Sequence, residues 1–164
     1  TNAVAAAQRT GVPLVRMIRP AWPEPDGAGW RHVETVEAAA AALPPGATAL
    51  ITTGHEGLEA FLARDDCRLV VRLIGRPALE LPPNVRLILM RPPYELEDEL
   101  ALFEREEISD LVTKNSGGAQ TEAKLEAAAR RNAGVIMIDR PILLPATETH
   151  TIAETIAALH LGNS

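Results

Sequence analysis

The fold is decided by residues 108–132, which read ISDLVTKNSGGAQTEAKLEAAARRN. Ile108–Thr113 is an apolar run typical of a buried strand, and Thr121–Asn132 is an alanine-rich stretch typical of a helix. The loop between them, Thr113–Gly118, contains a lysine and two glycines. A strand that passes through a short glycine-containing loop into a helix is the repeating unit of wound α/β sheets. This stretch therefore predicts an α/β domain with a loop suited to ligand binding.

The same alternation continues on both sides of this stretch. Further strands are predicted over residues 47–52, 68–74, 85–90 and 135–139, and further helices over residues 36–43, 57–64, 95–107 and 149–161. The strands are continuous runs of Val, Ile and Leu, as is typical of parallel strands that helices cover on both faces. We therefore predict a Rossmann-like or flavodoxin-like, mostly parallel sheet with helices on both faces.

A domain boundary is predicted at residues 20–29, which contain three prolines and two glycines and can continue neither a helix nor a strand. Before it, an alanine-rich helix and the short apolar strand Val12–Arg19 lack a start signal and are interpreted as the remnant of a preceding α/β domain. We predict that residues 1–19 end that N-terminal domain, residues 20–32 form a linker and residues 33–164 form the C-terminal α/β domain. The chain is expected to be a fragment of a longer protein.

The composition excludes several classes of function. With 16 basic and 22 acidic residues, a net charge of -6 and 3% aromatic residues, the chain lacks the features of nucleic-acid binding or attraction to an anionic membrane surface. No apolar run reaches the ~18 residues of a membrane span. The single cysteine, Cys67, favours a reducing cytoplasm, and four scattered histidines give no metal-ligand spacing, so no metal site is predicted.

Positive charge gathers where the predicted strands end. The five carboxyl ends read TTGH at 52–55, GR at 75–76, RPPY at 91–94, TKNSGG at 113–118 and RP at 140–141. Four of them deliver a Lys or Arg and the fifth delivers a His, although the chain as a whole is acidic. Because ligands of open parallel sheets bind beyond these ends, we predict an anion site there.

Two of these loops are candidates for a phosphate or another anion. The residues Lys114, Asn115, Ser116, Gly117 and Gly118 combine a cation, polar donors and close backbone approach just before a helix N-terminus. The alternative is a Gly-Gly turn with a solvated lysine. The residues Thr52, Thr53, Gly54 and His55 offer donors to a diphosphate or ribose, and the alternative is an ordinary capping turn.

Three arginines at or near strand ends, Arg72, Arg91 and Arg140, together suggest a site for a polycarboxylate, although each alone is typical of a structural ion pair. The helix over residues 95–107 carries seven acidic residues, which we predict to form its solvent-exposed face: Glu95, Glu97, Asp98, Glu99, Glu104, Glu106 and Glu107.

The sequence DLVTKNSGG at 110–118, with TEAKL at 121–125 and AAAR at 127–130, resembles the signature block of the precorrin-6A reductase family. VIMIDRP at 135–141 is similar to that family's closing strand, and RPAW at 19–22, TTG at 52–54 and RPPY at 91–94 match further landmarks in order. Two features depart from the family: its N-terminal Gly-Gly-Thr-type loop is missing, and an Arg often stands where this chain has His55.

This resemblance implies reduction of one double bond of the precorrin-6A macrocycle by hydride from NADPH, in cobalamin biosynthesis. It assigns residues 52–55 and 114–118 to the cofactor, the three arginines to substrate carboxylates and residues 1–19 to the end of a nucleotide-binding domain. The isolated chain is therefore not expected to catalyse.

The alternatives are a non-catalytic module that binds an anionic metabolite or nucleotide, and a relative of uroporphyrinogen-III synthase, another tetrapyrrole enzyme. The proton donor, the oligomeric state and the choice between metal-free and cobalt-containing substrate stay open.

Overall fold

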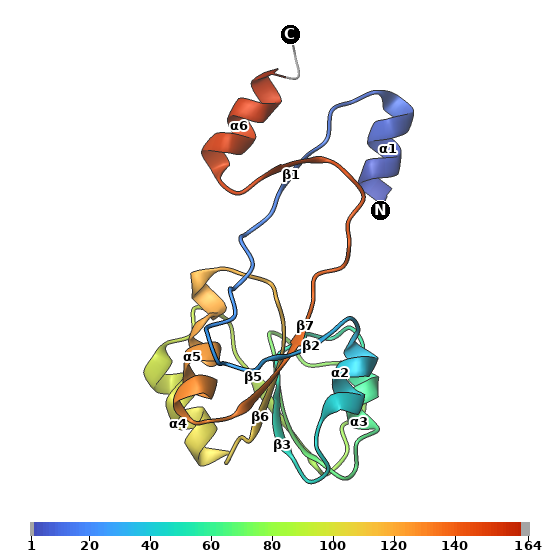
Figure 1. Cartoon of the computed structure of the whole chain (residues 1–164). Coiled ribbons are helices and arrows are strands. Elements are labelled where there is room, and N and C mark those ends of the chain that lie inside the picture. Colours follow the sequence, from blue (N-terminus) through green and yellow to red (C-terminus); the bar gives the residue numbers. More distant parts are fainter. Residues whose placement is uncertain (1, 162–164) are drawn as a thin grey trace. The chain divides into compact units, whose positions relative to one another are not determined.

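The computed structural model describes residues 2–161, which divide into two compact units (Figure 1). The larger unit is Trp22–Arg140, and the smaller unit joins Thr1–Ala21 to Pro141–Ser164. In the part of the chain that the structure describes, no helix is long and apolar enough to cross a membrane.

The larger unit is built on a six-stranded parallel sheet with the strand order β2-β7-β6-β3-β4-β5. Its strands are β2 (Arg31–Val33), β3 (Thr48–Ile51), β4 (Arg68–Leu73), β5 (Val85–Leu89), β6 (Asp110–Lys114) and β7 (Gly134–Ile138). Its helices are α2 (Val36–Ala42), α3 (Leu58–Leu62), α4 (Leu96–Arg105) and α5 (Ala123–Arg130), with a short 3₁₀ helix, η1 (Ala119–Thr121).

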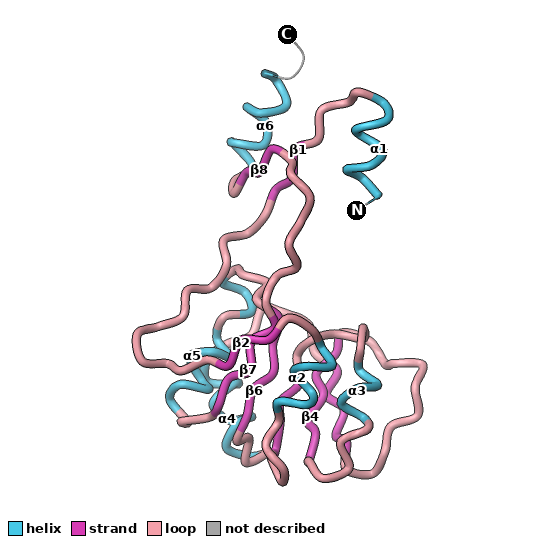
Figure 2. Tube along the Cα trace, turned by 45° about the vertical axis from the view of Figure 1, so that its right-hand side comes forward, coloured by secondary structure: helices cyan, strands magenta, loops and turns pink. Residues whose placement is uncertain are grey.

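Helices cover both faces of this sheet, with α2 and α3 on one side and α4 and α5 on the other (Figures 1 and 2). Strand β3 shows the consequence, because Ala49 and Ile51 lie in the core beside α2 and α3 while Leu50 lies in the core beside α4 and α5. A central strand buried on both faces must be apolar at every position, which explains the continuous runs in the sequence. The predicted fold class is confirmed.

The smaller unit contains two short parallel strands, β1 (Val15–Met17) and β8 (Thr147–Thr149), and two helices, α1 (Asn2–Thr10) and α6 (Ile152–Leu161). The backbone amide of Ile18 continues the pairing by donating to the carbonyl of Thr149 at 2.8 Å. The predicted boundaries placed residues 141–164 in the C-terminal domain, whereas the structure groups them with residues 1–21 because β8 pairs with β1.

The order of the strands reverses at the centre of the larger sheet. The chain forms the edge strand β2 first and then crosses to β3. From β3 it moves outward to β4 and β5, then returns to the other side of β3 as β6 and forms β7 between β6 and β2. A crevice forms at such a switch point, beyond the carboxyl ends of the two central strands. Here those strands are β3 and β6, so the loops that follow them, at residues 52–55 and 115–118, flank the crevice.

Candidate functional site

A cavity of about 210 Å³ lies at the carboxyl edge of the sheet, beside the switch point. It is lined by Thr52, Gly54, His55, Arg72, Leu73, Ile74, Tyr94, Ser116, Thr121 and Lys124. Strands β3, β4, β5 and β6 and helix α5 all deliver residues to it, which is the convergence expected of a parallel sheet. Five of the twelve residues predicted to bind cofactor or substrate meet in this cavity: Thr52, Gly54, His55, Arg72 and Ser116.

The two loops that flank the crevice are joined at their bases. The backbone amide and the hydroxyl group of Thr52 both donate to the carbonyl of Val112 in β6, at 2.9 and 3.0 Å. Farther out, the Nζ of Lys114 forms an ion pair with Glu56 at 3.2 Å. Lys114 therefore bridges the two loops but does not line the cavity.

Trp22 fixes the loop after β6. Its backbone amide donates to Oδ1 of Asn115 at 2.9 Å, and its indole Nε1 donates to the carbonyl of Gly118 at 3.3 Å. Gly117 and Gly118 have φ angles of 68° and 93°, which glycine adopts without strain. Gly117 is buried and Gly118 is half-buried, and among the described residues no backbone carbonyl accepts a hydrogen bond from their amides.

Arg72 forms the floor of the cavity together with two neighbours. Its guanidinium group forms an ion pair with Glu99 of α4, and the side chains of Arg72 and Glu99 are only 2% and 1% exposed. The ring of Tyr94 lies 3.9 Å from the guanidinium carbon, a cation–π contact. Within the described part of the chain, Arg72 Nη2 and Glu99 Oε2 have no hydrogen-bond partner.

Lys124 is a cavity residue that the sequence did not single out. It lies in the second position of α5, its side chain is buried, and its Nζ is 4.8 Å from the centroid of the Trp22 ring. Burial, followed by the charge of Arg72, lowers the pKa of Lys124 to about 8, although Glu99 acts in the opposite direction. Its spacing from the buried Ala127 and Ala128, at i+3 and i+4, was the available signal that it faces inward.

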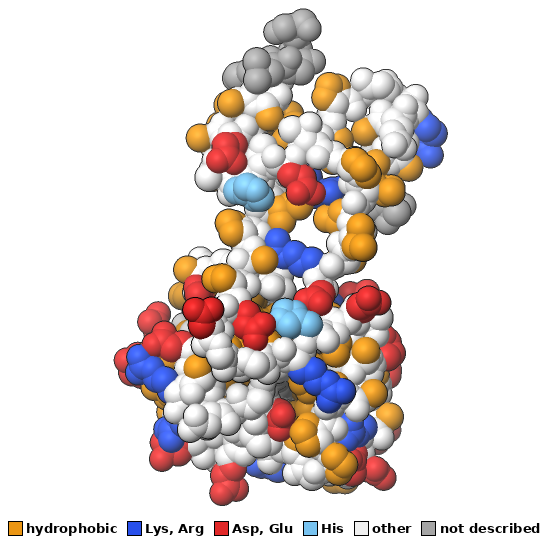
Figure 3. All heavy atoms as spheres, viewed as in Figure 1, with side chains coloured by type: hydrophobic (Ala, Val, Ile, Leu, Met, Phe, Trp, Pro, Cys, Tyr) orange, Lys and Arg blue, Asp and Glu red, His pale blue; other side chains and the backbone are white. Residues whose placement is uncertain are grey.

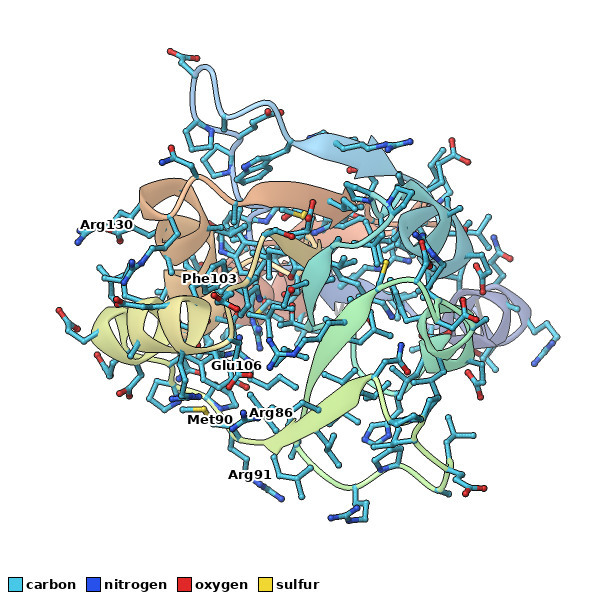
Figure 4. All side chains as sticks on the ribbon, turned by 90° about the horizontal axis from the view of Figure 1, so that it is seen from below. Arg86, Met90, Arg91, Phe103, Glu106 and Arg130 are labelled. Carbon is cyan, nitrogen blue, oxygen red and sulfur yellow. The ribbon has the colours of Figure 1, made fainter. Side chains whose placement is uncertain are left out.

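The other predicted site residues lie outside the cavity lining. Thr53 is buried, and its hydroxyl group has no hydrogen-bond partner among the described residues. Arg140 donates from Nε to the carbonyl of Asn115 at 2.6 Å and so supports the loop from behind. Arg91 is exposed and projects away from the fold after β5 (Figure 4).

The prediction that all seven acidic residues of the helix over 95–107 face solvent was wrong for two of them. Acidic side chains do cover the outer surface on the side of α4 and α5 (Figure 3). Glu99 and Glu106, however, are 1% and 0% exposed. They stand on the inner side of α4 with the buried Phe103, at spacings of four and three residues from it.

Glu106 is the centre of a second charged cluster, at the amino edge of the same sheet. Its carboxylate accepts hydrogen bonds from Arg68 at 2.8 Å, from Arg86 at 3.2 Å and from Arg105 at 3.1 Å. Figure 4 shows Arg86 of β5 directed toward it. Burial by itself would raise the pKa of Glu106, but the hydrogen bond from Arg105 and the charges of Arg86 and Arg68 lower it overall.

Comparison with known proteins places this geometry in a family. The family model described as precorrin-6x reductase CbiJ/CobK matches residues 1–160. The precorrin-6A reductase of Rhodococcus erythropolis is 43% identical over 149 residues, which cover 90% of this chain and 60% of that protein. The precorrin-6A reductase of Rhodobacter capsulatus is 39% identical over 142 residues, which cover 85% of this chain and 57% of that protein.

A solved structure described as CobK precorrin-6A reductase has the same fold. It superposes with a TM-score of 0.90 at 35% identity, covering 99% of this chain and 66% of that one. This chain therefore spans about three fifths of the length of the relatives that it matches. The strand–loop–helix block at residues 108–132, the cationic edge of the sheet and the match over residues 1–160 agree, and the chain belongs to the CbiJ/CobK precorrin-6x reductase family.

Proposed function

We propose that the complete protein is a precorrin-6A reductase of cobalamin biosynthesis, which adds a hydride from NADPH and a proton to one double bond of the precorrin-6A macrocycle. The observation that carries the proposal is the cationic cavity at the switch point of the sheet, in a chain that belongs to this family. The substrate class, a tetrapyrrole that bears many carboxylates, suits a floor built on a buried arginine.

The chain offers a suitable cradle for the phosphates of a dinucleotide. The candidate donors to phosphate oxygens are the backbone amides of Gly117 and Gly118, the hydroxyl group of Ser116 and the ammonium group of Lys114. The turn at residues 52–55 stands across the crevice and supplies further donors to the same ligand. NADPH, when bound, supplies the hydride, and the protein supplies binding, orientation and electrostatics.

Residues of the chain would hold the substrate in place. We assign Arg72 to a carboxylate of the macrocycle because it lines the cavity, and Tyr94 limits the movement of its guanidinium group. Arg140 would act through the loop, because it holds the carbonyl of Asn115, and Arg91 would meet a peripheral carboxylate from the edge of the sheet. A cytoplasmic location, which suits the free thiol of Cys67, is part of the same proposal.

The decisive experiment measures NADPH oxidation by the complete protein when precorrin-6A is supplied without oxygen. We expect one NADPH to be consumed for each macrocycle reduced, and weaker activity with NADH, which lacks the 2'-phosphate. If the protein binds NADPH and precorrin-6A but oxidises no NADPH, the reductase proposal fails and a binding module without catalysis is the better description.

A further inference from the structure

Two cations and one carboxylate meet at the inner end of the cavity. Arg72 comes from β4, Lys124 from α5 and Glu99 from α4, and all three side chains are at most 4% exposed. Counting formal charges gives two positive groups against one negative group. This part of the site therefore carries an unbalanced positive charge in a place that water hardly reaches.

The protein itself does not supply the missing negative group. Among the described residues, no carboxylate lies within ion-pair distance of Lys124, whose ammonium group faces the Trp22 ring. Glu99 is engaged by Nη1 of Arg72, which leaves Nη2 without a partner. An unpaired buried charge is costly, so the site is suited to gain a charged partner when a ligand binds.

We propose that Lys124 and Arg72 together bind one oxyanion, a carboxylate or a phosphate group, at the inner end of the cavity. Both side chains line the cavity, together with the exposed Ser116 and His55, so a ligand that occupies it meets both cations. The source of the oxyanion, a carboxylate of the tetrapyrrole or a phosphate of the dinucleotide, rests on the proposed function. The existence of the anion site does not.

The charge state of Lys124 gives this site a characteristic pH dependence. The charged groups around its ammonium group are Arg72 on β4 and Glu99 on α4, and its nearest ring is that of Trp22. Because burial and Arg72 lower the pKa of Lys124 to about 8, raising the pH through this value removes one of the two positive charges. Affinity for an anion of constant charge should then fall.

The test uses Trp22 as a built-in reporter, because Lys124 lies over its ring. Since the chain has two tryptophans, the Trp30→Phe background leaves Trp22 as the only one. Sulfate, NADP⁺ and uroporphyrin, a stable octacarboxylate, are titrated against this background alone and with Lys124→Gln or Lys124→Arg. The matched control is Arg130→Gln, which removes an exposed cation from the same helix.

We expect Lys124→Gln to weaken sulfate binding about tenfold or more, Lys124→Arg to keep affinity within about threefold, and Arg130→Gln to change nothing. If Lys124→Gln also weakens the binding of uroporphyrin but not of NADP⁺, the physiological oxyanion is a carboxylate of the tetrapyrrole. If it also weakens the binding of NADP⁺ but not of uroporphyrin, the oxyanion is a phosphate. If folded Lys124→Gln protein binds sulfate, NADP⁺ and uroporphyrin as the parent does, the proposal is overturned.

A second measurement covers the case in which Lys124→Gln does not fold. Sulfate affinity of the parent protein is followed between about pH 7 and about pH 9.5, where sulfate keeps its charge and only the protein titrates. A loss of affinity across this range supports the proposal, and a flat profile contradicts it. If sulfate binding depends on Lys124 but the protein does not oxidise NADPH, the proposed function is rejected and the proposed anion site is still supported.

Discussion

Strand β4 carries an arginine near each end, and the two ends use it differently. At the amino edge, Arg68 joins Arg86 and Arg105 around Glu106, and these three side chains are 46–57% exposed. At the carboxyl edge, the side chain of Arg72 is 2% exposed. The arginines around Glu106 are also in contact with water, whereas Glu99 is the only oppositely charged partner of Arg72 among the described residues. The same pair of residue types therefore makes a closed structural clamp at one edge and contributes to the proposed ligand site at the other.

Helix and strand geometry explain why both clusters use the same two elements. Arg68 and Arg72 lie four residues apart on one face of β4, about 13 Å along the strand. Glu99 and Glu106 lie seven residues apart on one side of α4, about 10.5 Å along the helix. A helix that runs antiparallel to the strand brings Glu106 to Arg68 and Glu99 to Arg72. A single packing arrangement thus places one buried carboxylate at each edge.

The largest effect is expected from Glu99→Gln, which removes the ion-pair partner of the buried Arg72. We expect the free energy of unfolding to fall by about 3–5 kcal/mol, the cost of breaking a buried ion pair from one side. Chemical denaturation measures this loss. Because the site is now more positive, the variant should also bind sulfate more tightly and recover stability when sulfate is added. A loss below about 1 kcal/mol would show that water already reaches this end of β4.

How far the sequence could predict these features follows from the range of the interactions. The alternation of strands and helices and the two loops at the switch point were visible because each depends on a local pattern. Glu99 and Glu106 could not be told apart from the other acidic residues of their helix, because their burial depends on contacts with β4 that are distant in sequence. The position of Lys124 over Trp22 is likewise a contact between distant parts of the sequence. Strands β2 and β8 have three residues each, too few to show a pattern.

A smaller effect is expected from Glu106→Gln at the amino edge. The side chains of the three arginines can reorient and be hydrated by solvent. We therefore expect the free energy of unfolding to fall by about 1–2 kcal/mol, less than for Glu99→Gln. Because the pKa of Glu106 is lowered from its ordinary value of 4.5, its contribution is present above pH 4.5 and is lost as the pH falls through the lowered value. Unfolding measured against pH should therefore show a flatter acid limb in the variant. Equal losses from Glu99→Gln and Glu106→Gln would remove the distinction between the two edges.

Lys114→Gln separates ligand binding from stability at the carboxyl edge. Its partner Glu56 is 89% exposed, so we expect a change in unfolding free energy below about 0.5 kcal/mol. Affinity for NADPH, measured by calorimetry, should nevertheless fall, because the lysine would face the phosphates. Glu56→Gln removes the same ion pair but keeps the cation and should leave NADPH affinity unchanged or higher. A large loss of stability in Lys114→Gln with unchanged binding would instead assign the loop a structural role.

The smallest effect is expected from an exposed cluster at the carboxyl edge, where His32 contacts Asp139 at 2.7 Å and Glu24 at 3.2 Å. The hydrogen bond to Asp139 raises the pKa of His32 above its ordinary value of 6.5, against the effect of burial and with a further contribution from Glu24. The stabilisation is therefore complete below pH 6.5 and is lost as the pH rises through the raised value. With the imidazole 40% exposed, we expect only a few tenths of a kcal/mol, seen as a shallow fall of the unfolding free energy that His32→Asn removes. If the free energy of unfolding falls with pH by as much as it falls in Glu99→Gln, then charge, and not burial, determines the strength of ion pairs at this edge.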